Sequence, residues 1–456
     1  MVDTVIAHLK NLLGDRLCVE ASVLEVHGKD ASYHPSQRPD AVVFPESVEE
    51  VSEIVRVCSE RSVPVIPFGT GTAVEGGVVA VRGGICIDLS RMNKFIAVNE
   101  DDMDVTVQAG VTRLQLNRHL AGMNTGLFFP VDPGADASLG GMAATRASGN
   151  AAVCYGTMRE NVLGLQVVLA SGDVIDVGGR ARKSSAGYDL THLFVGSEGT
   201  LGVIVGVTLK LARVPEAVSA AVCGFADVAS AVETVIRVMK AGIGLARIEL
   251  LDDVLMQAIN AYSGLNYPVT PTLFFEFQGS AFVVEERAKR VGEIVQSHGG
   301  TDFQWASGVE ERDRLFQARY DAYYACLALR EGAVGYVTDV CVPISKLADC
   351  ILKVKADLAK SALMAPLFGH VGDGNFHVVF PLDPNRLEEL EEAKHLSARM
   401  VTYALEMGGT CTGEHGIGLG KVDALRQEHG AGVDVMRAIK YALDPKGVMN
   451  PGKVIG

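Results

Sequence analysis

Two histidines in the C-terminal half of the chain, His370 and His377, enclose the segment Val-Gly-Asp-Gly-Asn-Phe. The Asp373-Gly374 pair within it is a strong signal for a two-residue type I′ hairpin turn. Such a turn would place His370 directly opposite His377, with Cβ atoms about 5 Å apart on one face of the hairpin. Two imidazoles at that separation could share one cation. The alternative is two unrelated histidines, in the core or on the surface.

A third imidazole and a carboxylate follow in the motif Thr412-Gly-Glu414-His415-Gly. Two histidines with a carboxylate suit Zn²⁺, Mn²⁺ or Fe²⁺, and the sequence does not choose among these ions. The pattern therefore predicts a metal site in the C-terminal half, with one histidine left over.

The glycines, 50 of 456 residues or about 11% against a usual share of about 7%, gather in loops. The first loop runs from Gly69 to Gly77. A dinucleotide fingerprint would need glycine where the chain has Val74, and a Walker A loop would need lysine after Gly76. What remains is a turn whose backbone N–H groups could bind an anion, or a loop that only connects two strands.

Two further loops of small residues cover 130–145 and 196–202. None of the three loops contains a lysine. Because the backbone rather than side-chain charge would then hold the ligand, we expect an extended cofactor, larger than a mononucleotide.

Strands and helices must hold these loops in place. Ser47 and Glu50 form a capping-box pattern that predicts a helix over 47–62, and a strand follows at 65–68, directly before the first loop. Strand-like runs recur at 84–89, 104–108, 162–169 and 201–211. Strands and helices are interspersed without strict alternation, which predicts an α+β fold.

The texture of the sequence changes near Pro215, where we place a domain boundary. Beyond it, helical patterns alternate with single strands, and helices are expected at 226–241, 252–261, 281–298, 308–330, 344–360 and 386–407. The predicted division is an N-terminal helical segment over 1–35, one domain over 36–215 and a second domain over 216–456.

The composition argues against several partners and locations. Lys+Arg 41 against Asp+Glu 55 gives a net charge of −14, which disfavours nucleic acid or an anionic membrane surface as a partner. Neither a secretory signal nor a membrane-spanning run is visible, so we expect a cytoplasmic protein. The nine cysteines contain no C-x-x-C pair, and we expect small buried residues in a reducing compartment rather than disulfides.

The motifs together carry a resemblance to a known family. PFGTGT…EGG, DPGADASLGGMAAT, ASGN…YGTMRENVLGL and GSEGTLGVI resemble the FAD domain of the vanillyl-alcohol-oxidase (PCMH-type) flavoproteins. GHVGDGNFH, TGEHGIG and MNPGK resemble the cap domain of the FAD-linked D-2-hydroxy-acid dehydrogenases. The resemblance covers the chain from about residue 35 to the end. It implies a PCMH-type FAD-binding domain of two subdomains, followed by an α+β, ferredoxin-like cap.

The same resemblance implies which residues hold FAD. Residues 69–72 would bind the pyrophosphate, the second loop would line the flavin and ribityl chain, and the third loop would flank the adenine. The last fifteen or so residues would return to the isoalloxazine through Asn450. The implied set is Pro67, Gly69, Thr70, Gly71, Thr72, Pro133, Ser138, Gly141, Met142, Ala144, Thr145, Gly149, Tyr155, Gly156, Glu198, Gly199, Ile204 and Asn450. The first loop contains no histidine, so non-covalent FAD is expected.

For the metal site, the resemblance points to His370, His377 and Glu414 as ligands and to zinc or manganese as the ion. It assigns His415 as the general base that takes the hydroxyl proton of a 2-hydroxy acid. A bound ion stabilises the developing alkoxide, and an imidazole with a pKa near neutrality can accept the proton. The alternatives for His415 are a fourth metal ligand or a structural residue.

The substrate carboxylate would be held by Arg319, which matches the arginine of the relatives and whose fork can bind both oxygens. The alternative is a solvated arginine on a charged helix face. Enzymes of the group that act on 2-hydroxyglutarate carry a lysine for the distal carboxylate, and the corresponding stretch 335–339 has none. A small or apolar substituent is therefore expected, and D-lactate before other D-2-hydroxy acids.

The resemblance also implies an electron acceptor: cytochrome c, a quinone or an electron-transfer flavoprotein. It allows a homodimer, and it places eukaryotic relatives in mitochondria. Two alternatives stay open. One is oxidation of glycolate or D-2-hydroxyglutarate on the same scaffold, and the other is a flavin electron-transfer subunit without substrate chemistry of its own.

Overall fold

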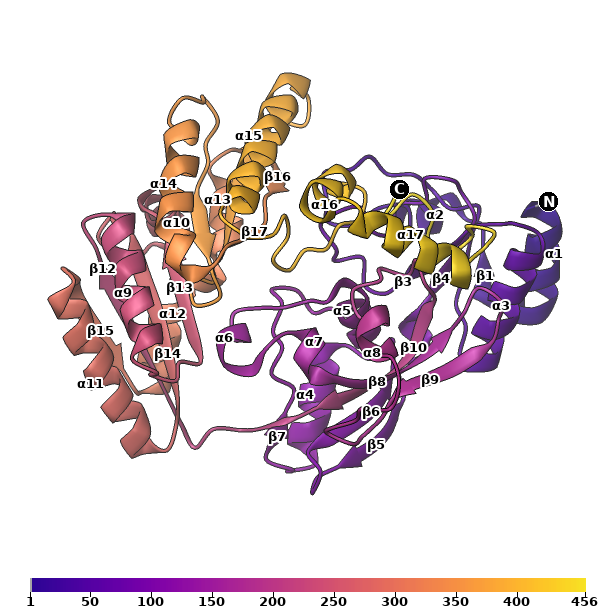
Figure 1. The fold of residues 1–456 in the computed structure, drawn as a ribbon, viewed down its shortest axis with the longest axis horizontal. Coiled ribbons are helices and arrows are strands. Elements are labelled where there is room, and N and C mark those ends of the chain that lie inside the picture. The colour runs from indigo at the N-terminus through magenta and orange to yellow at the C-terminus, as the bar shows by residue number, and fades with distance from the viewer. Residues whose placement is uncertain (1) are drawn as a thin grey trace. The chain divides into compact units, whose positions relative to one another are not determined.

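The computed structural model describes residues 2–456, which divide into two compact units (Figure 1). The first unit holds the chain up to Gly149, Gly156–Val214 and Glu414–Gly456. The second unit holds Asn150–Tyr155 and Pro215–Gly413. The sequence predicts a second domain over 216–456 whose last fifteen or so residues return to the flavin, whereas in the structure the chain rejoins the first unit earlier, at Glu414.

A four-stranded sheet in the first unit carries the first glycine loop. Its order is β1-β2-β4-β3, from β1 (Leu17–Cys18), β2 (Ala41–Val43), β4 (Ile85–Asp88) and β3 (Val65–Phe68). Strands β2, β4 and β3 are parallel. Helix α3 (Val48–Glu60) crosses from β2 to β3, and α1 (Val2–Leu13) packs beside it. The loop at Gly69 therefore leaves the carboxyl end of a buried parallel strand, where ligand loops are common.

The start of α3 confirms one half of the predicted capping box and contradicts the other. The Ser47 side chain accepts from the Glu50 N–H at 3.3 Å. The Glu50 carboxylate does not return to the Ser47 N–H, because it binds the Arg16 guanidinium at 2.5 and 2.6 Å and the Glu46 N–H at 2.8 Å. A bidentate ion pair holds a carboxylate more strongly than one backbone amide does.

A five-stranded antiparallel sheet carries the other two loops. Its order is β5-β6-β10-β8-β9, from β5 (Phe95–Asn99), β6 (Asp104–Gln108), β10 (Val203–Lys210), β8 (Val162–Val168) and β9 (Val174–Gly178). Helix α5 (Leu139–Thr145) packs on β10, and α4 (Arg113–Gly122) packs on the short strand β7 (Leu127–Phe128), which pairs with β11 (Ala212–Arg213). The strand predictions for this half of the chain are confirmed.

The second unit is built on an eight-stranded antiparallel sheet. Its path is β15-β12-β14-β13-β18-β19-β16, with β17 paired to β19. The strands are β12 (Ala217–Gly224), β13 (Arg247–Leu251), β14 (Thr272–Gly279), β15 (Thr301–Ala306), β16 (Val334–Val337), β17 (Val340–Cys341), β18 (Leu367–Gly369) and β19 (Asn375–Leu382). The first four, taken in chain order, lie 4-1-3-2 in the sheet, which is the ferredoxin-like arrangement that the resemblance implies.

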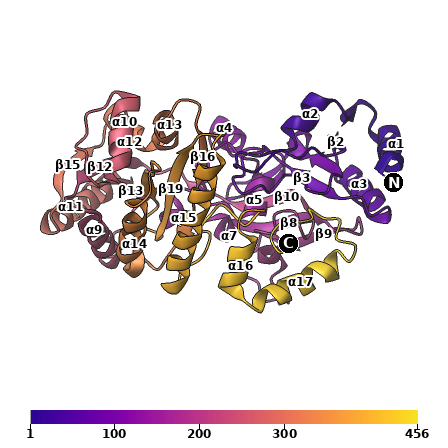
Figure 2. The ribbon, with the colours of Figure 1, turned by 90° about the horizontal axis from the view of Figure 1, so that it is seen from above.

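Helices cover both faces of this sheet. Figure 2 shows α9 (Val228–Lys240), α14 (Leu347–Leu358) and α15 (Leu387–Glu406) on one side of its strands, and α10 (Asp253–Ser263), α12 (Val309–Tyr320) and α13 (Ala322–Ala328) on the other. Helix α11 (Ala281–Ser297) packs on α9 and β14. The predicted helix over 308–330 is interrupted at Asp321, whose carboxylate accepts from the Ser263 hydroxyl of α10 at 2.5 Å.

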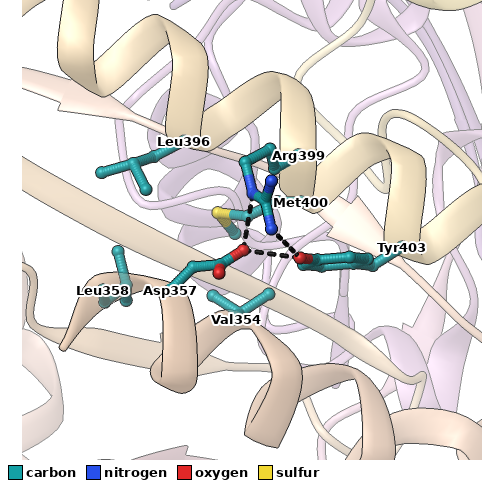
Figure 3. Close-up of a pocket in the computed structure, with 7 residues that line it drawn as sticks. All are labelled: Val354, Asp357, Leu358, Leu396, Arg399, Met400 and Tyr403. Atoms are coloured by element: carbon teal, nitrogen blue, oxygen red, sulfur yellow. Dashed lines mark hydrogen bonds and ion pairs between the residues drawn. The ribbon is translucent and has the colours of Figure 1, made fainter. Parts of the chain in front are cut away.

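Helices α14 and α15 are tied by a polar cluster over a small pocket lined by Val354, Leu358, Leu396 and Met400 (Figure 3). Asp357 accepts from Arg399 Nε at 2.7 Å and from the Tyr403 hydroxyl at 2.6 Å. These hydrogen bonds hold the pKa of Asp357 well below its usual range. The cluster lies at the surface, so it contributes modestly to stability.

The remaining helices are short or lie near the C-terminus. They are α2 (Ala21–Val26), α6 (Ala152–Tyr155), α7 (Met158–Asn161), α8 (Leu190–Phe194), α16 (Val422–His429) and α17 (Gly432–Leu443), with 3₁₀ turns at Gly14–Arg16, Leu89–Arg91 and Ile344–Lys346. Among residues 2–456, no helix combines the length and the apolar character needed to cross a membrane.

None of the nine cysteines, all within the described residues, forms a disulfide, and six of them are buried. Burial raises the pKa of the Cys58 thiol to about 12. Cys154 is exposed, which differs from the sequence expectation for that position.

Candidate flavin and metal sites

The three glycine loops lie against one another in the first unit. A Cβ added at Gly69 would lie 2.3 Å from Ser138 Oγ, so the first loop packs tightly on the start of α5. A Cβ added at Gly199 would lie 2.9 Å from Pro67 Cγ. The second and third loops are joined by backbone hydrogen bonds, including Glu198 N–H to the Ala144 carbonyl at 2.8 Å. The three loops, at 69–77, 130–145 and 196–202 of the sequence, thus form one cluster.

Asn450 closes this cluster from the C-terminal tail. Its N–H donates to the Val65 carbonyl at 2.8 Å, and its side-chain amide donates to the carbonyls of Gly77 at 2.9 Å and Glu198 at 2.7 Å. Within residues 2–456, the buried Oδ1 of Asn450 and the buried Oγ of Ser197 find no hydrogen-bond partner. Two buried polar atoms without a partner in a cluster of glycine-rich loops fit a large polar cofactor.

The other residues implied to bind FAD lie in different surroundings: some in loops, some in α5 and some in the hydrophobic core. Thr70 and Thr72 hydroxyls lie 3.2 Å apart in the first loop, and Thr145 donates back to Gly141 inside α5. Met142 and Ile204 are buried in the hydrophobic core that α5 shares with β10. Pro133, Gly149 and Gly156 lie in the turns around α5 to α7, and Gly149 approaches the Asp132 carbonyl too closely to carry a Cβ.

Glu198 and Tyr155 have protein partners that the sequence did not suggest. The Glu198 carboxylate accepts from the Ile417 N–H at 2.7 Å and the Gly418 N–H at 2.8 Å, and burial raises its pKa despite these bonds. Tyr155 groups with the second unit, where its hydroxyl donates to Gln278 at 2.5 Å. Desolvation raises the pKa of the Tyr155 phenol to about 12.

The histidine hairpin forms, but the predicted two-residue turn is wrong. His377 pairs with Phe368 rather than with His370, and the connection is longer. Asp373 does not have the positive φ that a type I′ turn needs, and the turn is closed by Asp373 N–H to the His370 carbonyl at 3.0 Å. Gly374 has a positive φ of 79°, and a Cβ there would also lie 2.0 Å from the Val342 carbonyl.

The two imidazoles nevertheless meet, with ring centroids 5.6 Å apart at 78°. His370 Nδ1 donates to Glu249 Oε1 at 2.7 Å, and His377 Nδ1 donates to the Thr338 carbonyl at 3.0 Å. Both acceptors lack a proton, so each ring carries a hydrogen on Nδ1, and in the neutral form its lone pair is on Nε2. This is the arrangement of metal-ligating histidines, whose other nitrogen is held by a carboxylate or carbonyl.

Glu414 supplies the carboxylate of the set. The ligand atoms of His370, His377 and Glu414 all lie within 4.8 Å of one another, and both histidines are buried. Two imidazole nitrogens and a carboxylate oxygen fit zinc or manganese. Asp339, His377 and His415 form an overlapping group within the same distance.

Asp339 is less suited than Glu414 as a ligand because its oxygens are already used. Oδ1 accepts from Asn375 Nδ2 at 2.7 Å, and Oδ2 accepts from the Thr412 hydroxyl at 2.7 Å and the Gly413 N–H at 2.8 Å. This buried carboxylate therefore fixes the segment that leads directly into Glu414.

Arg319 lies on α12 with only 14% of its side chain exposed, so it does not occupy a solvated helix face. Its Nε donates to Glu249 Oε2 at 2.8 Å, and its guanidinium carbon lies 5.1 Å from the centroid of the Phe368 ring. Within residues 2–456, Nη1 and Nη2 donate to no protein acceptor. Such a fork is suited to a carboxylate.

Sequence reasoning missed Glu249 and Asp339. Glu249 alternates with Arg247 inside the apolar strand β13 and is fully buried. A carboxylate within an apolar strand is expected to be buried, and a buried acid is almost always paired, so this position in the sequence was the available signal. Burial alone would raise the pKa of Glu249, but the charges and hydrogen bonds of His370 and Arg319 lower it below its ordinary value.

Comparison with known proteins decides the family. Residues 39–178 match the FAD binding domain model, and residues 214–454 match the model for the C-terminal domain of FAD linked oxidases. The chain belongs to the FAD-linked oxidase family. It is a flavin-dependent oxidoreductase, and the resemblance derived from the motifs is confirmed, as is FAD as the cofactor.

The relatives cover nearly the whole chain. "Probable D-lactate dehydrogenase, mitochondrial" of Danio rerio is 52% identical over 100% of this chain and 92% of its own length. "D-lactate dehydrogenase [cytochrome], mitochondrial" of Arabidopsis thaliana is 47% identical over 99% and 80%. "Glycolate oxidase subunit GlcD" of Bacillus subtilis is 35% identical over 94% and 92%.

Solved structures support the fold class. p-Cresol methylhydroxylase superposes with a TM-score of 0.83 at 20% identity, covering 99% of this chain and 96% of that one. 4-Ethylphenol oxidase from Gulosibacter chungangensis superposes with a TM-score of 0.81 at 16% identity, again covering 99% of this chain and 96% of that one. The predicted α+β, PCMH-type architecture is therefore confirmed.

Proposed function

We propose that this protein oxidises D-lactate to pyruvate with FAD and one divalent ion, zinc or manganese. The observation that carries the proposal is the pair of histidines whose Nδ1 atoms are held by Glu249 and Thr338, with the Glu414 carboxylate within 4.8 Å of their ligand atoms. A flavin carrier without substrate chemistry has no use for such a set. The names of the D-lactate dehydrogenase relatives support the choice of substrate.

The reaction removes two electrons and two protons from a secondary alcohol. When bound, the flavin accepts the electron pair with the α-hydrogen, and the divalent ion makes the hydroxyl more acidic. His370, His377 and Glu414 hold the ion. Arg319 binds the substrate carboxylate through Nη1 and Nη2 and thereby orients the α-carbon. His415 accepts the hydroxyl proton as general base.

The small substituent of lactate agrees with the lack of a lysine in the segment 335–339. A second candidate is glycolate, because the Bacillus subtilis protein is named for glycolate oxidation. Electrons would pass on to a carrier such as cytochrome c, a quinone or an electron-transfer flavoprotein, and the word "cytochrome" in several relatives' names favours the first. A homodimer and a cytoplasmic location stay predictions; several relatives are named as mitochondrial.

Anaerobic reduction of the flavin tests the proposal directly. The protein loaded with FAD and zinc or manganese is mixed with D-lactate, L-lactate, glycolate and D-2-hydroxyglutarate, and the loss of the flavin absorbance is followed in time. D-Lactate should bleach the flavin fastest and L-lactate should not bleach it. Faster bleaching by glycolate would favour the second candidate, and no bleaching by any of the four would contradict the proposal.

A further inference from the structure

Several polar side chains lie side by side on one face of the sheet in the second unit. Arg247 and Glu249 point to this face from β13, and Glu276, the register partner of Arg247, joins them from β14. Phe368 pairs with His377 across β18 and β19, and His370 follows Phe368 at the same side-chain parity. Glu249 lies in the middle of this row and is fully buried.

The two oxygens of Glu249 have different partners. Oε1 accepts from His370 Nδ1 at 2.7 Å, and Oε2 accepts from Arg319 Nε at 2.8 Å. His370 and Arg319 come from segments far apart in the chain, and each donates a hydrogen bond to this one carboxylate. A charged group with no exposed surface persists only when both oxygens are satisfied in this way.

We propose that Glu249 is a positioning residue that couples metal binding to substrate binding. The inference rests on the proposed function, because it takes His370 as a metal ligand and Arg319 as the carboxylate anchor. Glu249 itself touches neither ion nor substrate. It acts through the orientation of the two groups that do.

The effect on the metal follows from the imidazole of His370. A carboxylate oxygen can only accept, so Glu249 keeps the proton on Nδ1 and the lone pair on Nε2, as a metal ligand requires. It also makes the ring a stronger donor to the ion. Loss of such a partner typically lowers metal affinity about 10- to 100-fold.

The effect on the substrate follows from the guanidinium of Arg319. Glu249 binds Nε, which leaves Nη1 and Nη2 side by side for the substrate carboxylate. The Phe368 ring lies under the guanidinium and limits its rotation. If the Nε bond were lost, Arg319 would be freed to turn, and the KM for the hydroxy acid would rise.

Glu249→Gln tests whether Glu249 must accept from both His370 and Arg319 or only has to fill a buried position. Glutamine has the same shape but one accepting oxygen, so it can satisfy His370 Nδ1–H or Arg319 Nε–H and must present its NH₂ group to the other. We expect Glu249→Gln to weaken Zn²⁺ and Mn²⁺ binding about 10- to 100-fold and to raise the KM for D-lactate in the same variant.

The double variant Glu249→Gln/Arg319→Met sharpens the test. Without Arg319, the glutamine oxygen is available to His370, and no unpaired buried charge remains. Metal affinity should return to within about threefold of the wild type, while the KM stays high. Arg319→Met alone should raise the KM and leave metal affinity near the wild-type value, because Glu249 still binds His370.

A matched control comes from β6 in the first unit. Asp104 is also buried and ion-paired, through Arg180 at 3.0 Å, and it accepts from Asn99 Nδ2 at 2.6 Å. Asp104→Asn should lower the melting temperature without changing metal affinity. This separates a general loss of stability from a loss of positioning.

Metal affinity is measured by calorimetric titration of the metal-stripped, FAD-loaded protein with Zn²⁺ or Mn²⁺, and KM by steady-state kinetics with D-lactate. If Glu249→Gln binds the metal as tightly as the wild type, the inference is wrong, but the proposed function is not affected. Failure of the double variant to recover metal affinity would overturn the bridging role. If the wild-type protein binds neither ion, the metal site of the proposed function is wrong, and the inference is wrong with it.

Discussion

Asp339 accepts a hydrogen bond from the backbone N–H of Gly413 at 2.8 Å. The same buried carboxylate accepts from Asn375, which begins β19 two residues before His377, and from the Thr412 hydroxyl. One side chain therefore fixes both the strand that carries His377, a proposed metal ligand, and the segment that leads into Glu414. The spacing of the proposed metal ligands depends on this relationship.

Asp339→Asn should disturb that spacing while conserving volume. An amide has one accepting oxygen, so at least one donor among Asn375, Thr412 and Gly413 would face an NH₂ group, at a cost of about 1–3 kcal/mol. We expect a lower melting temperature and metal affinity reduced about tenfold or more. Calorimetric titration with Zn²⁺ measures the affinity, and an unchanged value would show that Glu414 is held by other contacts.

His415→Ala tests the general base. We expect turnover to fall about 10²- to 10⁴-fold, with the FAD and metal content of the purified protein unchanged. Flavin absorbance and elemental analysis give the contents, and steady-state assays give kcat. A variant that keeps most of its activity would rule out His415 as the base, and one that loses its metal would identify His415 as a ligand.

Chelation tests whether the ion is catalytic. The proposed metal ligands His370, His377 and Glu414 are not among the residues expected to hold FAD, so removing the ion with a chelator should abolish activity and leave the flavin absorbance in place. Adding back Zn²⁺ or Mn²⁺ should restore turnover. Simultaneous loss of the flavin colour would instead indicate a structural ion.

Gly69→Ala tests the packing of the first glycine loop. The new Cβ would lie 2.3 Å from Ser138 Oγ, so either the loop moves away from α5 or the Ser138 hydroxyl turns away from the Gly141 N–H that it caps. We expect FAD affinity to fall at least about tenfold, which corresponds to roughly 1.4 kcal/mol. Gly122→Ala is the matched control, because a Cβ at that position meets nothing within 4 Å. Flavin-fluorescence titration of the apoprotein measures both; equal affinities would mean that the loop does not contact FAD.

His27 gives a pH-dependent prediction in the first unit. Its Nε2 lies 2.8 Å from Asp88 Oδ2; burial alone would lower the pKa of His27, but this bond and the Val23 carbonyl raise it above 6.5. A raised folded-state pKa stabilises the fold below the unfolded pKa, and this contribution is lost as pH rises through the folded value.

His27→Gln should therefore reduce the unfolding free energy most at pH 6 and below, by about 1–3 kcal/mol, with a smaller difference at pH 8.5. Denaturant unfolding across this range measures it. The exposed pair of His8 with Glu53 provides the control, since His8→Gln should change little at any pH. A pH-independent difference for His27→Gln would show that the imidazole is neutral in the folded protein.

The sequence by itself predicted the features that depend on neighbouring residues. The strand before Gly69, the helix after Ser47 and the histidine-bearing hairpin each follow from side-chain periodicity, a cap or a turn signal, which act over a few residues. The motifs of the glycine loops were also sufficient to indicate the family. The turn at Asp373-Gly374 was the exception: Gly374 has a positive φ but Asp373 does not, so the predicted type I′ turn does not form.

Only the tertiary structure decided how distant segments share polar groups. Glu249 lies 121 residues from His370 and 70 from Arg319 in the sequence, and Asp339 lies 74 residues from Gly413. The return of the chain to the first unit at Glu414 is of the same kind. Burying a carboxylate is favourable only when its partners arrive from elsewhere in the fold, and no local pattern specifies which donors those will be.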